Sequence, residues 1–306
     1  MKVLTQHFKE VEKRLEFPKE AVELFEKIAL KIEKSKTLSK KFEQARNMVL
    51  SHERGRLDEA LDMLSRVGFF YGIQKYAFHM VLLLSLTEDV LARYREKGIS
   101  EDIYWDSVND IKYKFKECVE CKECYGTFVA SWNSGFIALN RFALGRFQFE
   151  YATWGGEDYT SSAGVTVKKG DKTVGFHIPS SGVPLTDDVR LDSYKRAYEF
   201  FKDQRREDGL LVFECGSWLI YDDYKTFLPE NSNTVKFIND FEIVSSEPRD
   251  KFNDAWRIFA KWGYKNPKKW PEDTSMRRAF KKFVLDGNKT GHGHGVIIFD
   301  GERIIR

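Results

Sequence analysis

The chain has 306 residues, of which 42% are hydrophobic and 15% aromatic, so it is globular rather than disordered and long enough for two domains. Its 50 basic and 47 acidic residues leave a formal net charge of +3, which argues against a dedicated nucleic-acid-binding protein. The longest apolar run, residues 77–92, contains charged side chains and is too short to span a bilayer. No signal peptide is recognisable at the start. We expect a cytoplasmic protein with no membrane or nucleic-acid partner.

Residues 1–126 are predicted to form helices, because apolar residues recur there every three or four positions. The segment 76–94 is the most apolar and should form the core of this half. A hydrophobic residue, Ser100 and two acidic residues predict a helix start near Ser100. The isolated histidines of this half are expected to be surface or packed residues rather than ligands: His7, His52 and His79.

Three of the four cysteines lie close together, at Cys118, Cys121 and Cys124. Their flanks are typical of a helix, which would place the three thiols on one side of it. We expect structural thiols. A zinc or iron–sulfur site is the less favoured alternative, because no fourth ligand lies nearby in sequence.

The hydrophobic period changes from helical to alternating near residue 126, which predicts domains at 1–126 and 127–306. Residues 145–151 should form a strand with Phe147 and Phe149 on one face and Glu150 on the other. Residues 210–218 are apolar on both faces and predict a central strand. The other predicted elements are a hairpin at 164–178 with its turn at 169–171, a short helix at 221–228, a strand at 234–244, helices at 252–262 and 274–285, and a last strand at 296–299.

The segment from Lys172 to Phe201 combines a short strand, a loop rich in small residues and a helix. The loop is Pro179–Pro184. The helix should start near Thr186, followed by two acidic residues. A helix N-terminus after such a loop directs unpaired backbone N–H groups at an anion, although an ordinary strand-to-helix turn explains the same pattern. The expected apolar stripe of this helix is Leu191, Tyr194, Ala197, Tyr198 and Phe201.

The order of elements after residue 126 is similar to the GNAT acyltransferase fold. The segments that narrow the match are GRFQFE (145–150), FHIP (176–179), CGSWLI (215–220), LPENSNTVKF (228–237) and TSMRRAF (274–280). Together they resemble a bacterial family of GNAT-like acyltransferase proteins with an N-terminal helical domain and a C-terminal GNAT-like domain. The resemblance implies an α/β fold of the α+β type with a mixed sheet.

The resemblance further implies an acyl-CoA-dependent N-acyltransferase that uses acetyl-CoA or another acyl-CoA, with the amine of a small molecule or peptide as acceptor. A homodimer is left open. The pyrophosphate of CoA would be bound by Ser180, Ser181, Gly182 and Val183. The superfamily's Arg/Gln-x-x-Gly-x-Gly/Ala pattern is replaced here by PSSGVP, and Pro184 has no N–H. The alternative from another class is a catalytically inactive GNAT-like protein that binds or senses a ligand.

Amine acylation needs a base for the amine and an acid for the departing thiolate. Candidate bases are Glu150, His177 and Glu214. Each has a structural alternative: an ion pair with Arg146, a hydrogen-bonded core histidine and a buried ion pair, respectively. The resemblance places the acid at Tyr221, or at Tyr224, at the start of the element after the central strand.

Two further patterns carry weaker hypotheses. A nucleophilic pair of Cys215 and His177 is conceivable, but a buried inert thiol is favoured. His292 and His294 should project to one side of a strand, as metal ligands sometimes do. We expect no metal, and a metal hydrolase that also uses Glu150 is a distant third hypothesis.

Overall fold

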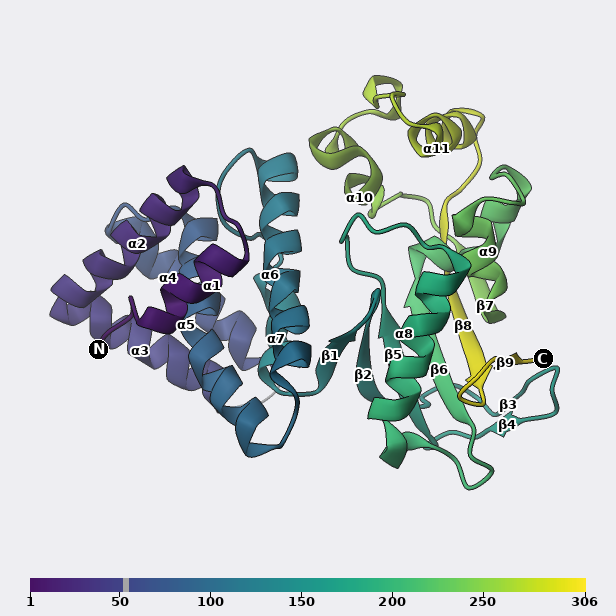
Figure 1. Ribbon diagram of the computed structural model, residues 1–306. Coiled ribbons are helices and arrows are strands. Elements are labelled where there is room, and N and C mark those ends of the chain that lie inside the picture. Colours follow the sequence, from purple (N-terminus) through teal and green to yellow (C-terminus); the bar gives the residue numbers. More distant parts are fainter. Residues whose placement is uncertain (52–54) are drawn as a thin grey trace. The chain divides into compact units, whose positions relative to one another are not determined.

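The computed structural model describes residues 1–51 and 55–306, so His52 lies outside the described residues. The chain divides into two compact units, Met1–Phe142 and Ala143–Arg306 (Figure 1). The boundary between the units lies later in the sequence than the change of hydrophobic period near residue 126. The reason is that the short helical turns at Ala130–Asn133 and Ser134–Ile137 belong to the first unit. None of the described helices is long and apolar enough to cross a membrane.

The first unit is a helical bundle around α5 (Lys75–Glu96). Residues 77–87 of this helix are all buried, so it is enclosed on every side, as its continuous apolar sequence predicts. It packs against α1, α2, α4 and α6. Ser100 caps α6, because its hydroxyl accepts a hydrogen bond from the Asp102 N–H at 3.2 Å. The other helices are α1 (Gln6–Arg14), α2 (Lys19–Lys34), α3 (Lys36–Leu50), α4 (Arg56–Phe70), α6 (Glu101–Lys122) and α7 (Ser134–Ile137).

Among the described residues of this unit, His7 and His79 are packed in the bundle and the cysteines are free thiols. His7 is hydrogen-bonded to the Tyr104 hydroxyl at 2.8 Å. His79 lies 3.1 Å from the Leu61 carbonyl, and burial lowers its pKa to about 4. Cys118 and Cys121 are buried on α6, and all four cysteines of the chain are free thiols.

A mixed sheet forms the second unit, in the order β1-β2-β5-β6-β8-β7, with β9 paired to β8. The β5–β6 pair is parallel, whereas β2–β5, β6–β8 and β7–β8 are antiparallel. The predicted central strand is β6, which lies between β5 and β8. The strands are β1 (Arg141–Leu144), β2 (Phe147–Thr153), β5 (Lys172–His177), β6 (Leu211–Ser217), β7 (Glu242–Pro248), β8 (Gly291–Phe299) and β9 (Ile304–Ile305).

One face of this sheet is aromatic and buried. Phe147 stacks on Tyr194 of α8 (Asp187–Phe200), with ring centroids 5.8 Å apart. Phe147 also contacts Phe237 of α9 (Asn233–Asn239) at 5.7 Å. Both helices therefore cover the aromatic face, which leaves the polar residues of β2, β5 and β6 on the opposite face. A second core lies around Tyr224 and Phe280, between the turns after β6, α10 (Ala255–Phe259) and α11 (Ser275–Leu285).

The predicted hairpin at 164–178 is wrong. The turn exists, since the Asp171 N–H donates to the Lys168 carbonyl at 2.9 Å. However, β5 pairs with β2, and the short β4 (Thr166–Val167) pairs with β3 (Tyr159–Thr160). Pairing with β2 is favoured because it stacks Phe149 on Phe176, with centroids 5.2 Å apart, in the aromatic core.

The predicted strand at 234–244 is also wrong, since residues 233–239 form α9 and β7 begins only at Glu242. Ser232 caps the helix by accepting from the Val235 N–H at 3.2 Å. The helix is then held by burial of Val235, Phe237 and Ile238, so tertiary packing overrides the β-branched sequence.

Three smaller predictions also need correction. The predicted helix at 221–228 is a 3₁₀ turn at Asp222–Thr226. The last predicted strand begins earlier, at Gly291, and is followed by β9. Leu191 is exposed rather than part of the buried stripe of α8.

Candidate active site

Glu150 and His177 form a pair on the polar face of the sheet. The Nε2 atom of His177 lies 2.9 Å from Oε1 of Glu150, and each side chain is 23% exposed. Glu150 lies opposite Gly175 in the β2–β5 register, and His177 is two residues further along the same face. A Cβ on Gly175 would come within 2.8 Å of Cγ of Glu150, so the glycine lets the Glu150 side chain lie across β5. Two of the predicted bases therefore meet.

Glu214, the third predicted base, lies on the same face. It is opposite Gly175 in the parallel β5–β6 register. Its Oε1 accepts a hydrogen bond from the Thr173 hydroxyl. Its Oε2 lies 3.3 Å from Nε2 of His294 on β8. Glu214 therefore forms the ion pair expected as its structural alternative when His294 is protonated.

The pairing between β5 and β6 stops at the row of Gly175 and Glu214. The paired positions are Val174 with Phe213 and Gly175 with Glu214, although β5 continues to His177 and β6 to Ser217. Beyond this row, β5 remains paired to β2 and β6 remains paired to β8. The sheet therefore opens between β5 and β6 at the level of His177.

The loop after β5 is held by Arg146, which comes from the turn before β2. Its Nε donates to the Val183 carbonyl and its Nη1 to the Pro179 carbonyl, both at 2.8 Å. These two contacts attach the Arg146 guanidinium to the loop. The predicted phosphate-binding residues lie together in this loop. Gly182 has φ +79°, and the Val183 N–H donates to the Ser181 hydroxyl at 3.3 Å.

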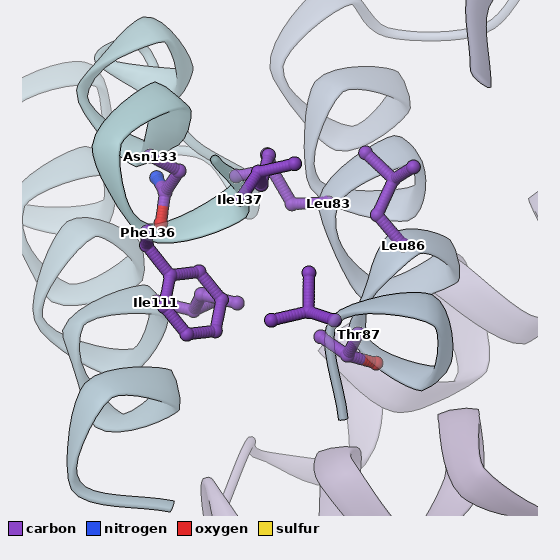
Figure 2. A pocket seen from close by; sticks show the side chains of 8 residues that line it. Leu83, Leu86, Thr87, Ile111, Asn133, Phe136 and Ile137 are labelled. Atoms are coloured by element: carbon purple, nitrogen blue, oxygen red, sulfur yellow. The ribbon is translucent and has the colours of Figure 1, made fainter. Parts of the chain in front are cut away.

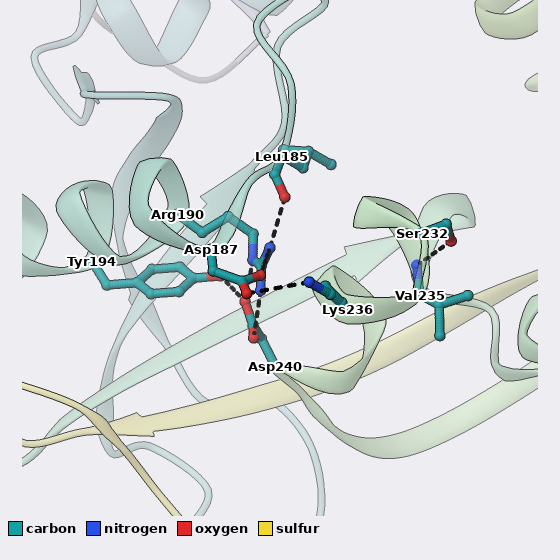
Figure 3. Close-up of polar contacts among 8 residues, drawn as sticks. All are labelled: Leu185, Asp187, Arg190, Tyr194, Ser232, Val235, Lys236 and Asp240. Atoms are coloured by element: carbon teal, nitrogen blue, oxygen red, sulfur yellow. Dashed lines mark hydrogen bonds and ion pairs between the residues drawn. The ribbon is translucent and has the colours of Figure 1, made fainter. Parts of the chain in front are cut away.

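Arg190 fixes the other end of the loop (Figure 3). Its Nη1 donates to the Leu185 carbonyl at 2.7 Å. Its Nε and Nη2 form a fork with Asp240, at 2.6 and 3.1 Å. The Tyr194 hydroxyl donates to the same carboxylate at 2.9 Å. The guanidinium is buried, and its pKa is raised because the paired Asp240 carboxylate outweighs the cost of burial.

The first turn of α8 is occupied by its own acidic residues. The Asp188 carboxylate accepts hydrogen bonds from the Thr186 hydroxyl and from the N–H groups of Asp188 and Val189, which lowers its pKa. Asp187 is paired with Arg190 and Lys236. An anion at this place would therefore use the backbone of the loop rather than the first turn of the helix.

Tyr221 and Cys215 lie away from the polar face. The Tyr221 hydroxyl donates to Asp223 at 2.7 Å, and burial together with this contact raises its pKa to about 12. Cys215 follows Glu214 on the strand and so points to the opposite, aromatic face, where it is buried. The structure therefore does not bring Cys215 and His177 together, and Cys215 is a buried thiol, which was the favoured interpretation.

The two histidines of β8 share one face, as predicted. His294 stacks on Trp154, with ring centroids 5.2 Å apart. Burial and Arg249 lower the pKa of His292. Within residues 1–51 and 55–306, no three His, Cys, Asp or Glu side chains are grouped as metal ligands.

A cavity in the helical unit is separate from these residues (Figure 2). Its walls are apolar except for Thr87 and Asn133, and it has no room for a water molecule. The Asn133 side-chain N–H donates to the Ala130 carbonyl at 3.3 Å. The cavity is a packing defect of the bundle core. Its walls are formed by Leu83, Leu86, Thr87, Val90, Ile111, Asn133, Phe136 and Ile137.

Sequence reasoning missed the roles of His294, Arg146 and Arg190. The His-x-His spacing identified the face of His294 but not its partner. The partner that defines it, Glu214, is on another strand 80 residues away. Arg146 and Arg190 hold loop carbonyls, which carry no side-chain signal, and the carboxylate that Arg190 also binds, Asp240, is 50 residues away.

Comparison with known proteins assigns both units. Residues 6–139 match the N-acyltransferase N-terminal domain, and residues 141–297 match the GNAT-like C-terminal domain. No curated protein matches the chain significantly.

Solved acyltransferase structures share the fold. One is an acyltransferase mutant in complex with octanoyl-CoA, with TM-score 0.76 and 18% identity over 96% of this chain and 88% of that one. Another is an acyltransferase in complex with decanoyl-CoA and teicoplanin, with TM-score 0.75 and 19% identity over 96% and 88%. A third, with decanoyl-CoA, has TM-score 0.72 and 19% identity over 95% and 87%. With its mixed sheet, its N-terminal helical bundle and these two matches, the chain belongs to the family of N-acyltransferases with a GNAT-like C-terminal domain.

Proposed function

We propose that the protein is an acyl-CoA-dependent N-acyltransferase that acylates the amine of a small molecule or peptide. The observation that carries the proposal is the opening between β5 and β6 beside the Glu150–His177 pair. A thioester lying in that opening would be within reach of a carboxylate–imidazole pair able to accept a proton from an amine.

The co-substrate is proposed to be acetyl-CoA or another acyl-CoA. Structures of similar fold hold octanoyl-CoA and decanoyl-CoA. In the present chain the loop after β5 would bind the pyrophosphate through the backbone of Ser180, Ser181, Gly182 and Val183. Arg146 supports this role, because it engages the Pro179 and Val183 carbonyls, whose oxygens would otherwise repel a phosphate.

The base is proposed to be Glu150 acting with His177. The carboxylate and the imidazole are in contact, and both are partly exposed, so the pair can meet a substrate. Within the pair, the His177 imidazole orients the Glu150 carboxylate, which accepts the proton. A neutral primary amine attacks the thioester carbonyl as its proton passes to the pair.

The test is turnover with defined acyl donors and amines. Purified protein is mixed with acetyl-, octanoyl- or decanoyl-CoA and with an amino sugar, a polyamine or a lysine peptide, and released CoA thiol is measured. We expect amine-dependent release with at least one donor. CoA binding without release for any amine favours the ligand-binding alternative.

Binding is measured separately by thermal shift. A donor held at one hundred times its Kd adds roughly 2.7 kcal/mol of stability, which gives a clear rise in Tm. No shift with CoA or any acyl-CoA overturns the proposed function.

A further inference from the structure

The opening in the sheet has a histidine on each side. His177 lies on the β2–β5 side, opposite Gln148. His294 lies on the β6–β8 side, opposite Gly216. The β5–β6 register places Gly216 level with His177, two residues after the last paired row. Both imidazoles are on the polar face, and Gly216 adds no side chain between them.

Each histidine is backed by a glutamate from that last row. Glu150 faces His177 at 2.9 Å, and Glu214 faces His294 at 3.3 Å. Glu150 and Glu214 flank Gly175 in the register of the three strands. The site thus contains two carboxylate–imidazole pairs, whereas removal of a proton from the amine needs only one.

The second pair is oriented for a defined task. The Thr173 hydroxyl fixes one carboxylate oxygen of Glu214, so the other oxygen faces His294. The Trp154 ring lies nearly parallel to the imidazole, at 15°, and holds its plane. Because Nε2 of His294 is directed at Glu214, Nδ1 is the nitrogen left for a reactant. The His294 side chain is 31% exposed, which permits such contact.

The proposed reaction needs a proton donor for the departing sulfur. Of the two predicted donors, Tyr221 is 3% exposed and already donates its hydroxyl hydrogen to Asp223, and Tyr224 is fully buried in the second core. Cys215 faces the other side of the sheet. We propose that His294, oriented by Glu214, protonates the CoA thiolate as it leaves. This inference rests on the proposed acyltransferase function.

The step balances as follows. The amine nitrogen forms a bond to the acyl carbon, and the carbon–sulfur bond breaks with its electron pair passing to sulfur. The Glu150–His177 pair takes one proton from the nitrogen, and the protonated imidazole of His294 gives one proton to the sulfur. The products are the amide and free CoA. Solvent then returns a proton to His294 and removes one from the Glu150–His177 pair.

His294 has neighbours on β6, β8 and β7. Glu214 approaches from β6, and His292 lies two residues away on β8. On β7, the residue opposite His294 is Ser245, and Glu247 lies opposite His292. Burial and the nearby Arg249 lower the pKa of His292.

The test compares pH profiles of kcat with acyl-CoA in the full-length protein. An acid that must be protonated produces an alkaline limb. We expect His294→Asn to lower kcat by roughly a hundred- to ten-thousand-fold, to lose the alkaline limb and to keep the acid limb and the acyl-CoA Kd. Glu214→Gln should move the alkaline limb to lower pH, because the imidazolium loses the carboxylate that stabilises it.

His292→Asn is the matched control, since it removes an imidazole from the same strand and face and should leave the alkaline limb in place. An alkaline limb that persists in a folded His294→Asn protein with unchanged acyl-CoA affinity overturns the inference alone. If His294→Asn fails to fold, the position of the alkaline limb in Glu214→Gln decides instead. If the wild-type protein transfers no acyl group to any amine, the proposed function itself fails.

Discussion

Nε2 of His177 and Oε1 of Glu150 are 2.9 Å apart, and the contact joins neighbouring strands across a glycine. Gly175 has no side chain to separate the two residues, and a Cβ atom at this position would collide with Cγ of Glu150. This relationship decides which residues a catalytic test should change first, because each partner sets the orientation of the other.

Glu150→Gln keeps the shape of the side chain and removes the proton acceptor. We expect kcat to fall by roughly a hundred- to ten-thousand-fold, with little change in acyl-CoA affinity. The acid limb of the pH–rate profile should disappear in the same variant. If kcat survives and only the free energy of unfolding falls, Glu150 is an ion-pair residue of the sheet, and His177→Gln is the next variant to measure.

Gly182→Glu tests the loop. It adds negative charge and a side chain at a left-handed position, φ +79°, so we expect weaker CoA binding by isothermal titration. Gly164→Glu is the matched control: φ is +77° and a Cβ there also meets open space. Both variants should be similarly strained, but only the first should lose CoA affinity. If the two variants bind CoA with the same Kd, the loop is not part of the CoA-binding site.

Asp240→Asn tests the anchor of the same loop. The change leaves the guanidinium of Arg190 buried without its forked carboxylate, which should cost roughly 3–5 kcal/mol in the free energy of unfolding. Asp192→Asn is the control. It breaks the exposed ion pair between Arg196 and Asp192 on α8 and should cost less than about 1 kcal/mol in the free energy of unfolding. Urea denaturation measures both. If both variants lose the same free energy of unfolding, Asp240 contributes no more to stability than an exposed carboxylate does.

Glu12 predicts how stability depends on pH. Burial, with a contribution from Glu26, raises its pKa from 4.5 to about 8. The native state therefore disfavours the ionised form, and stability is lost as pH rises from about 4.5 to about 8. Glu12→Gln should remove this loss, with a gain on the order of a few kcal/mol at pH 9 and none at pH 4.

Exposed Glu43 on α3 gives the control for that experiment. Glu43→Gln should leave the pH dependence of the unfolding free energy unchanged. If the stability of the Glu12→Gln protein follows that of the wild type from pH 4 to pH 9, the pKa of the Glu12 carboxyl is not raised in the native state.

Local periodicity was sufficient for much of the second unit. A two-residue period placed Phe147 and Phe149 on one face and Glu150 on the other, and continuous apolarity identified β6 as central. The sequence of the strand, the loop and α8 was also predictable from proline, glycine and the cap at Thr186. These features depend on neighbours within a few positions, which is the range over which backbone sterics and side-chain alternation act.

Strand partners depended on contacts that no local pattern contains. β5 follows a turn from β4, yet it pairs with β2 because that register completes the aromatic face. Residues 233–239 have β-branched side chains, yet they form α9 because three of them are buried on the core. Burial on a distant surface outweighs a local preference of less than about 1 kcal/mol per residue.

From the sequence alone, Glu150, His177 and Glu214 were titratable residues on predicted strands and His294 lay just before one, each with a structural alternative. The order of the strands decided that they form two pairs, Glu150 with His177 and Glu214 with His294. A hydrogen bond or ion pair requires atoms within about 3–4 Å. For residues 27 and 80 positions apart, only the folded sheet can set that distance.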